Sequence, residues 1–138
     1  MKPILYVGNR NYSSWSMRPW FVLKYSGLEF ETIDIELDAE GYGKAQVADV
    51  LAVSPTGRVP ALKADDLSIW DTLAISEWVA EQAPNAELWP KDRDTRALAR
   101  AVVCEMHSGF GDIRTHLTCN IRRRVKEQNW NETTRIKT

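Results

Sequence analysis

Residues 54–62 read Ser54-Pro55-Thr56-Gly57-Arg58-Val59-Pro60-Ala61-Leu62, and Asp71-Thr72 follows nine residues after Leu62. A proline is tolerated where an edge strand begins, because that position needs no backbone N–H donor. Val59 would then present an unpaired backbone edge to an extended, peptide-like ligand. Asp71-Thr72 is typical of a helix start, whose free N–H groups favour a negatively charged group. The stretch therefore predicts a strand and a helix that together hold a peptide-like ligand by its backbone and its charged end.

The composition indicates a globular protein. The 138 residues suffice for one ordinary domain, or for a small domain with part of another. Because 18 Lys and Arg residues nearly balance 19 Asp and Glu residues, we expect neither nucleic acid nor a membrane surface as a partner. The start of the chain has too short an apolar run for a signal peptide, so we expect a cytoplasmic protein. With no CxxC and only two histidines, we expect no metal site.

The hydrophobic pattern alternates between the period of a strand and the period of a helix. A serine pair before an apolar helical stretch, with Pro19 expected in its first turn, predicts a helix that closes near Gly27. In full, we expect strands at 3–7, 30–36, 59–63 and 67–70, and helices at 13–27, 43–51 and 71–83. The order β-α-β-α-β-β-α places the chain in the α/β fold class.

This order, with a proline at the start of the third strand, resembles the thioredoxin-like domain of the glutathione S-transferase family. Three pieces carry the resemblance, at the spacings that the family shows: residues 12–18, 59–62 and 71–75. The serine pair is most similar to the Ser-Ser-Cys-x-x-Arg pattern of the zeta class and related bacterial enzymes, although Trp15 stands in place of the cysteine. The resemblance implies a detoxifying transferase, or an isomerase-like enzyme, that uses glutathione as co-substrate to attack a small electrophile and needs no metal.

The resemblance also implies the site residues. Val59, before a cis Pro60, would pair its backbone N–H and C=O with the cysteinyl part of glutathione, and Asp71 with Thr72 would hold the γ-glutamyl end. Ser13 matches the residue whose hydroxyl donates to the sulfur at the positive end of the first helix. Ser14 and Tyr12 remain alternatives for that contact.

Each of these features has a plainer interpretation. Pro60 would only begin an edge strand, Asp71 would only cap the helix at 71–83, and Ser13 with Ser14 would only cap the helix at 13–27. The ordered set of motifs favours the ligand site over the three separate structural roles.

The pattern changes after residue 83. Residues 84–94 are expected to form a linker, and Asp92 or Asp94 would cap a long helix that begins near Thr95 and bends near residues 109–111. Its apolar face has helical spacing: Leu98, Val102, Met106, Gly109, Ile113, His116 and Leu117. We therefore expect a thioredoxin-like domain at 1–83 and an incomplete all-helical domain at 95–138, in which 130–138 would start a further helix. The resemblance implies a homodimer.

Three functions remain in competition. The first is a glutathione S-transferase, and the second is a non-catalytic glutathione-binding module or an inactive fragment of a transferase. The third is a thioredoxin-like oxidoreductase, which the absence of a cysteine near Ser13 and Trp15 disfavours. The sequence leaves open the electrophile and the activity of the short chain.

Overall fold

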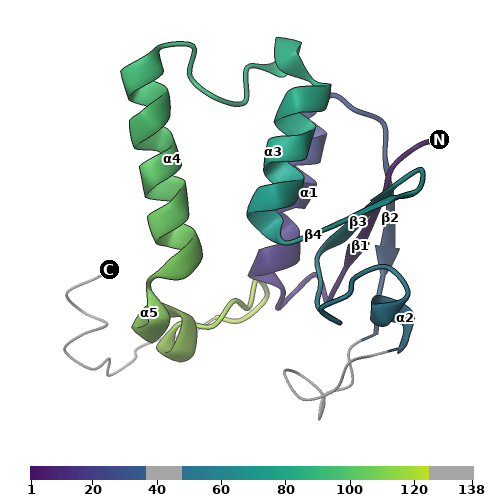
Figure 1. The fold of residues 1–138 in the computed structure, drawn as a ribbon. Coiled ribbons are helices and arrows are strands. Elements are labelled where there is room, and N and C mark those ends of the chain that lie inside the picture. Colours follow the sequence, from purple (N-terminus) through teal and green to yellow (C-terminus); the bar gives the residue numbers. More distant parts are fainter. Residues whose placement is uncertain (37–47, 125–138) are drawn as a thin grey trace. The chain divides into compact units, whose positions relative to one another are not determined.

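The computed structural model describes residues 1–36 and 48–124. The chain divides into two compact units, Met1–Leu88 and Trp89–Thr138. The elements of the first unit are β1 (Ile4–Val7), α1 (Ser14–Ser26), β2 (Glu31–Asp34), α2 (Ala48–Leu51), β3 (Ala61–Ala64), β4 (Leu67–Trp70), α3 (Thr72–Gln82) and the 3₁₀ turn η1 (Pro84–Ala86) (Figure 1). The predicted order β-α-β-α-β-β-α is confirmed, with the segment 43–47 of the expected second helix outside the described residues.

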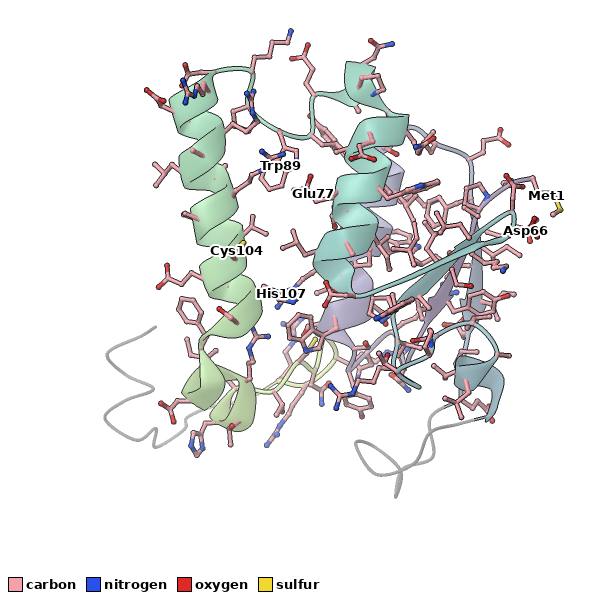
Figure 2. The ribbon with its side chains drawn as sticks, viewed as in Figure 1. Met1, Asp66, Glu77, Trp89, Cys104 and His107 are labelled. Carbon is pink, nitrogen blue, oxygen red and sulfur yellow. The ribbon has the colours of Figure 1, made fainter. Side chains whose placement is uncertain are left out.

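The four strands form one sheet in the order β2-β1-β3-β4. β1 runs parallel to β2, which is the pairing that the intervening helix α1 allows, and antiparallel to β3. β3 and β4 form the predicted hairpin around Asp65, where the amino group of Met1 donates to the carboxylate at 2.6 Å. Figure 2 shows Met1 beside Asp66 of the same turn. The predicted strand at 59–63 begins later than expected, because Val59 and Pro60 precede β3.

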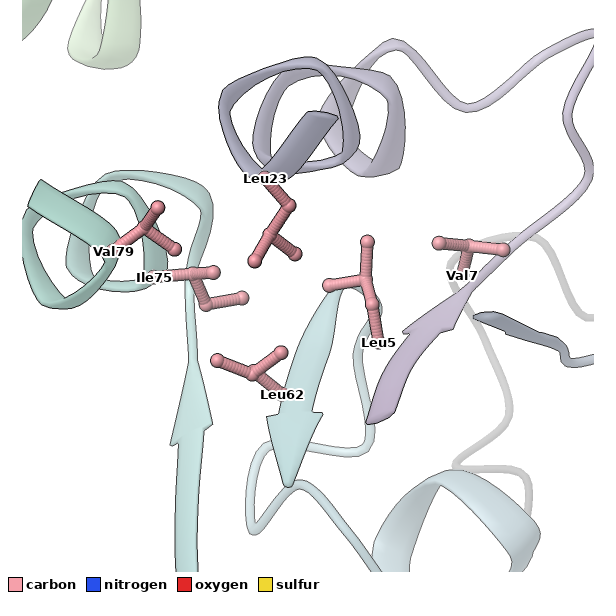
Figure 3. Packing of buried hydrophobic residues seen from close by; sticks show 6 residues of the cluster. All are labelled: Leu5, Val7, Leu23, Leu62, Ile75 and Val79. Carbon is pink, nitrogen blue, oxygen red and sulfur yellow. The ribbon is translucent and has the colours of Figure 1, made fainter. Parts of the chain in front are cut away.

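The core lies between the sheet and two helices. Leu5 and Val7 point to the same face of β1 because side chains alternate along a strand, and Leu62 of β3 joins them. Leu23 of α1 and the pair Ile75 and Val79 of α3 close the cluster from the helix side (Figure 3). All six side chains are almost completely buried, so α1 and α3 are fixed against the sheet next to each other.

Local sequence signals set both ends of α1. The Ser13 side chain caps its first turn, and Gly27 ends it in the left-handed region at φ 77°. Pro19 is not in the first turn, contrary to expectation; it is the sixth residue of the helix and is fully buried. The helix therefore contains one carbonyl whose usual donor, the N–H of residue 19, does not exist.

The second unit begins with α4 (Arg93–Ser108), whose N-cap is Asp92. The Asp92 carboxylate accepts from the Thr95 N–H at 2.8 Å, so the helix starts two residues before the predicted Thr95 and shortens the expected linker, which also contains η1. Figure 2 labels Cys104 and His107 on α4 and Trp89 in the segment that precedes this helix in the sequence. The Arg100 guanidinium of α4 lies 5.4 Å from the centre of the Trp89 ring.

The expected single helix with a bend is instead two helices, because α4 ends at Ser108 and α5 (Gly111–His116) follows. Gly109 is extended, and Phe110 takes a left-handed φ of 61°, which interrupts the helical hydrogen-bond ladder. The Arg114 side chain donates to the Gly109 carbonyl at 2.9 Å and also to the Met106 carbonyl, so it satisfies oxygen atoms that the helix end leaves open. The expected helix at 130–138 lies outside the described residues. Among the helices that the structure describes, none has the length and apolar character needed to cross a bilayer.

Candidate functional site

Strand register brings the three sequence motifs to one edge of the sheet. Tyr6 of β1 pairs with Ala61 of β3, and Ala61 pairs in turn with Trp70 of β4. The carboxyl ends of β1 and β4 therefore meet the amino end of β3. The loop that leads from β1 to Ser13, the Val59-Pro60 dipeptide and the Asp71-Thr72 helix start all continue from these three neighbouring residues. Segments separated by about 60 positions in the sequence thus lie together.

Val59 is half-buried immediately before β3, and its bond to Pro60 is cis, as expected. Within residues 1–36 and 48–124, neither its backbone N–H nor its carbonyl takes part in a hydrogen bond. The pairing of β3 with β1 begins only at Ala61, so the ladder does not use these groups. Val59 therefore has the donor and the acceptor that an extended peptide-like ligand requires.

Asp71 and Thr72 form the start of α3. Asp71 is its N-cap, and the Oδ1 atom accepts from Leu73 N at 2.8 Å and Ala74 N at 3.3 Å. The Thr72 hydroxyl donates to the Trp15 carbonyl at 2.8 Å. The Thr72 backbone N–H makes no hydrogen bond within the described residues, so it is the first open donor of the helix. Asp71 has φ 81° and ψ 136°, a region that a non-glycine residue rarely occupies and that costs about 1–3 kcal/mol.

Pro19 explains the contact between Thr72 and Trp15. In an α-helix the carbonyl of residue 15 accepts from the N–H of residue 19. Proline has no N–H, so the Trp15 carbonyl has no helical donor, and the Thr72 hydroxyl takes that place. One hydrogen bond between chain positions 57 residues apart thus fixes the start of α3 against the start of α1.

The serine pair lies at the start of α1. Ser13 is the N-cap and is 7% exposed, whereas Ser14 is the first helical residue and is half-buried. The Ser13 hydroxyl donates to Ser16 Oγ at 2.9 Å, and its oxygen accepts from Ser16 N at 3.2 Å. The Ser14 hydroxyl makes no hydrogen bond within the part of the chain that the structure describes, and Tyr12 is exposed. Both serines lie at the positive end of the α1 dipole.

Ser16 is the residue that the sequence analysis missed. Its side chain is 3% exposed, and it joins the Ser13 hydroxyl to the backbone N–H of Gly8 at the end of β1, at 3.1 Å. The available signal was the spacing Ser13-x-x-Ser16, which is the spacing of a helix capping box with serine in place of Glu or Gln.

Two arginines lie close to the site. Arg10 makes a two-point contact with Asp34 at the end of β2, with Nε to Oδ1 at 2.7 Å and Nη2 to Oδ2 at 2.6 Å. This hydrogen bonding holds the pKa of Asp34 below its usual range and raises the pKa of Arg10, while slight burial opposes both shifts. The Arg18 guanidinium lies 4.4 Å from the centre of the Trp15 ring, so the position that differs from the zeta pattern is covered by a cation.

The chain is similar to curated proteins named maleylacetoacetate isomerase. The alignment with the mouse protein is 36% identical over 109 residues and covers 79% of this chain and 49% of the mouse protein. The alignment with the Pseudomonas aeruginosa protein is 33% identical over 108 residues and covers 75% of this chain and 50% of that protein. The chain spans about half the length of the curated relatives it matches.

Solved structures show the same fold. A glutathione transferase homologue from Burkholderia with bound glutathione is 33% identical, with a TM-score of 0.67 over 83% of this chain and 58% of that one. A Sulfitobacter homologue with bound glutathione is 27% identical, with a TM-score of 0.66 over 78% of this chain and 49% of that one. The thioredoxin-like α/β fold predicted from the sequence is confirmed.

The family model described as "Glutathione S-transferase, N-terminal domain" matches residues 12–82. The match begins just before Ser13 and ends with α3, so it spans all three motifs that meet at the sheet edge. The chain belongs to the glutathione S-transferase family.

Proposed function

We propose that residues 1–83 form a glutathione-binding domain and that the protein is a glutathione S-transferase acting on a small electrophile. The observation that carries this proposal is the register of Tyr6, Ala61 and Trp70, because it brings a backbone edge, a helix start and a pair of hydroxyls to one place. The names of the curated relatives favour an isomerase-like reaction among those that the family performs.

In the proposed complex, glutathione lies across this edge as an extended peptide. The Val59 N–H and C=O pair with its cysteinyl residue in the manner of an added strand. The γ-glutamyl carboxylate accepts from the Thr72 N–H, where the positive end of the α3 dipole favours an anion. The Asp71 carboxylate accepts from the γ-glutamyl ammonium group. The Thr72 hydroxyl donates to Trp15 and so acts by holding α3 in position, a narrower role than the sequence predicted.

The thiol of the bound cysteinyl residue then reaches the start of α1. A thiol with a pKa of about 8.5 is mostly protonated at neutral pH. A hydroxyl from Ser13 or Ser14 that donates to the sulfur, together with the α1 dipole, stabilises the thiolate and lowers that pKa. The thiol proton leaves to water, and the sulfur attacks the electrophile held beside it.

We further propose a homodimer that acts in detoxification in the cytoplasm. The family resemblance supports the dimer, the detoxifying role and the location. The residues that would select the electrophile belong to the all-helical domain proposed to begin with α4.

Calorimetric titration with glutathione tests the binding mode. The variant Asp71→Asn keeps an N-cap acceptor and tolerates positive φ but removes the charge that meets the ammonium group. A charge-assisted hydrogen bond contributes about 1.5–3 kcal/mol, so we expect at least about tenfold weaker binding. Asp92→Asn, at the N-cap of α4, is the matched control and leaves the affinity unchanged. The proposal is wrong if the folded wild-type chain binds no glutathione.

Activity toward a chromogenic aryl halide separates the transferase from a non-catalytic glutathione-binding module. The wild-type rate should exceed that of glutathione in buffer, and Ser13→Ala or Ser14→Ala should lower it, depending on which hydroxyl contacts the sulfur. Glutathione binding without any rate above buffer would support the binding module instead.

A further inference from the structure

A chain of hydrogen bonds runs beneath the proposed thiol site. The Gly8 N–H donates to Ser16 Oγ at 3.1 Å, and the Ser13 hydroxyl donates to the same oxygen at 2.9 Å. The Ser16 N–H returns to Ser13 Oγ at 3.2 Å. With Ser13 at 7% and Ser16 at 3% exposure, these groups have little access to water. They therefore depend on each other for hydrogen bonds.

Ser16 differs from the usual third residue of a capping box. A Glu or Gln there turns back to the N–H of the N-cap residue. In this protein the Ser13 N–H already donates to the Asn9 carbonyl at 2.8 Å. The Ser16 hydroxyl is thus not needed for that N–H, and it contacts Gly8 and the Ser13 hydroxyl instead. This arrangement connects the end of β1 to the side chain that the family resemblance assigns to the thiol.

The direction of one hydrogen bond matters for catalysis. Ser13 has a single hydroxyl proton, and donating it to Ser16 leaves none for the sulfur. Ser16 has a hydroxyl proton of its own. If Ser16 rotates its O–H toward Ser13 Oγ, the Ser13 proton becomes free to turn toward the thiolate. The donors then run in one direction, from Gly8 N–H to Ser16, to Ser13 and to sulfur, and each bond polarises the next.

We propose that Ser16 is a positioning residue for thiolate formation, which rests on the proposed function. Its buried oxygen holds the Ser13 side chain when no ligand is bound, and its proton replaces the one that Ser13 gives to the sulfur. No covalent bond of the protein changes, and the thiol proton leaves to water. The Gly8 N–H fixes the position of the Ser16 oxygen throughout.

The test compares two ligands over a pH series by calorimetry: glutathione and S-methylglutathione, which has no ionisable thiol. Where the bound thiol pKa lies below the free value of about 8.5, glutathione affinity rises with pH between the two. Ser16→Ala should raise the bound thiol pKa by about 0.5 unit, about a threefold change in the ratio of thiolate to thiol. Its affinity for S-methylglutathione should equal that of the wild type.

Three further variants separate positioning from stability. Ser16→Thr keeps the hydroxyl and should restore the wild-type pH profile. Ser26→Ala removes a hydroxyl at the other end of α1 that bonds Leu23 O and Leu28 N; it should lower the melting temperature without moving the profile. If Ser16→Ala does not fold, the nearly isosteric Ser16→Cys, whose thiol is a weak donor, should show the same pKa rise.

The outcomes are distinguishable. If the wild type binds neither ligand, the proposed function fails and the role of Ser16 fails with it. If the wild type binds glutathione with a lowered thiol pKa and Ser16→Ala leaves that pKa unchanged, Ser16 only stabilises α1 and the inference is wrong. A raised pKa that Ser16→Thr reverses supports it.

Discussion

Helices α3 and α4 both repeat apolar residues at helical spacing, yet within the described residues 1–36 and 48–124 these side chains are buried on α3 and exposed on α4. Ile75 and Val79 of α3 are fully buried against α1 and the sheet. On α4, Leu98, Val102 and Met106 are 66%, 56% and 41% exposed, and the helix has no buried residue. The period of a sequence therefore identifies the apolar side of a helix, whereas the burial of that side depends on which other elements pack against it.

The same difference applies to the polar groups at the two helix starts. Thr72 is 5% exposed and donates to a carbonyl of another helix, whereas Thr95 is exposed and donates to its own N-cap Asp92 at 2.6 Å. Long-range packing makes the first contact part of the candidate site. The second contact is local and would form in an isolated helix.

The largest expected effect tests the two apolar faces directly. Ile75→Ala removes buried side-chain atoms from the core and should lower the free energy of unfolding by about 2–5 kcal/mol, because a cavity adds to the lost burial. Val102→Ala on α4 should change it by less than about 0.5 kcal/mol. Urea unfolding followed by circular dichroism measures both.

A large loss of unfolding free energy in Val102→Ala would contradict the difference expected between the apolar faces of α3 and α4. It would mean that the α4 face is covered in solution, and sedimentation of the wild-type chain would show whether a second copy covers it. A small cost for Ile75→Ala would mean that the core is looser than the burial of Ile75 indicates.

The next effect concerns the helix starts. Thr72→Val removes the donor to the partly buried Trp15 carbonyl and should lower the free energy of unfolding by about 1–2 kcal/mol. Thr95→Val should lower it by less than about 0.5 kcal/mol, since water replaces its exposed contact. Equal losses of unfolding free energy for the two variants, measured by urea unfolding, would show that the Thr72 contact stabilises the fold no more than the local Thr95 contact.

A Pro19 variant tests the hydrogen bond between Thr72 and Trp15 more directly. Pro19→Ala restores an N–H four residues after Trp15, so the Trp15 carbonyl regains a helical donor. The cost of Thr72→Val should therefore be smaller in the Pro19→Ala background than in the wild type. A double-mutant cycle measures this coupling directly, and strict additivity would refute the explanation.

Most of the first unit was predictable because its signals are local. Capping serines, Gly27 after α1 and the hairpin around Asp65 each act within a few residues, so the element order was predicted correctly. The errors fell where a side chain from another element takes part. Arg114 closes the end of α4 and helps to divide the predicted long helix, while Pro19 is accommodated beyond the first turn by a hydroxyl from α3.

The same distinction between local sequence signals and contacts with other elements applies to the candidate site. The sequence motifs named Val59, Asp71 and Ser13, and the register of Tyr6, Ala61 and Trp70 brings their segments together. Their roles toward glutathione remain proposals. Sequence reasoning could not see that the Thr72 hydroxyl is used by Trp15, nor that Ser16 meets Gly8, because both contacts depend on how α1 lies against its neighbours.

The smallest effect is a pH-dependent one at the surface of the first unit. The hydrogen bonds from Arg10 hold the folded-state pKa of Asp34 below the unfolded value of about 3.9. A lowered carboxyl pKa stabilises the fold above the unfolded pKa, and that contribution is lost as pH falls through the folded pKa. Because both side chains are more than half exposed, solvent screens the pair, and Asp34→Asn should cost only about 0.2–1 kcal/mol at pH 7. Urea unfolding over a descending pH series should show the difference between Asp34→Asn and the wild type shrink, because the carboxyl becomes protonated first in the unfolded chain and then in the folded chain. A difference that stays constant over the series would mean that Asp34 acts through packing of its side chain and not through its charge.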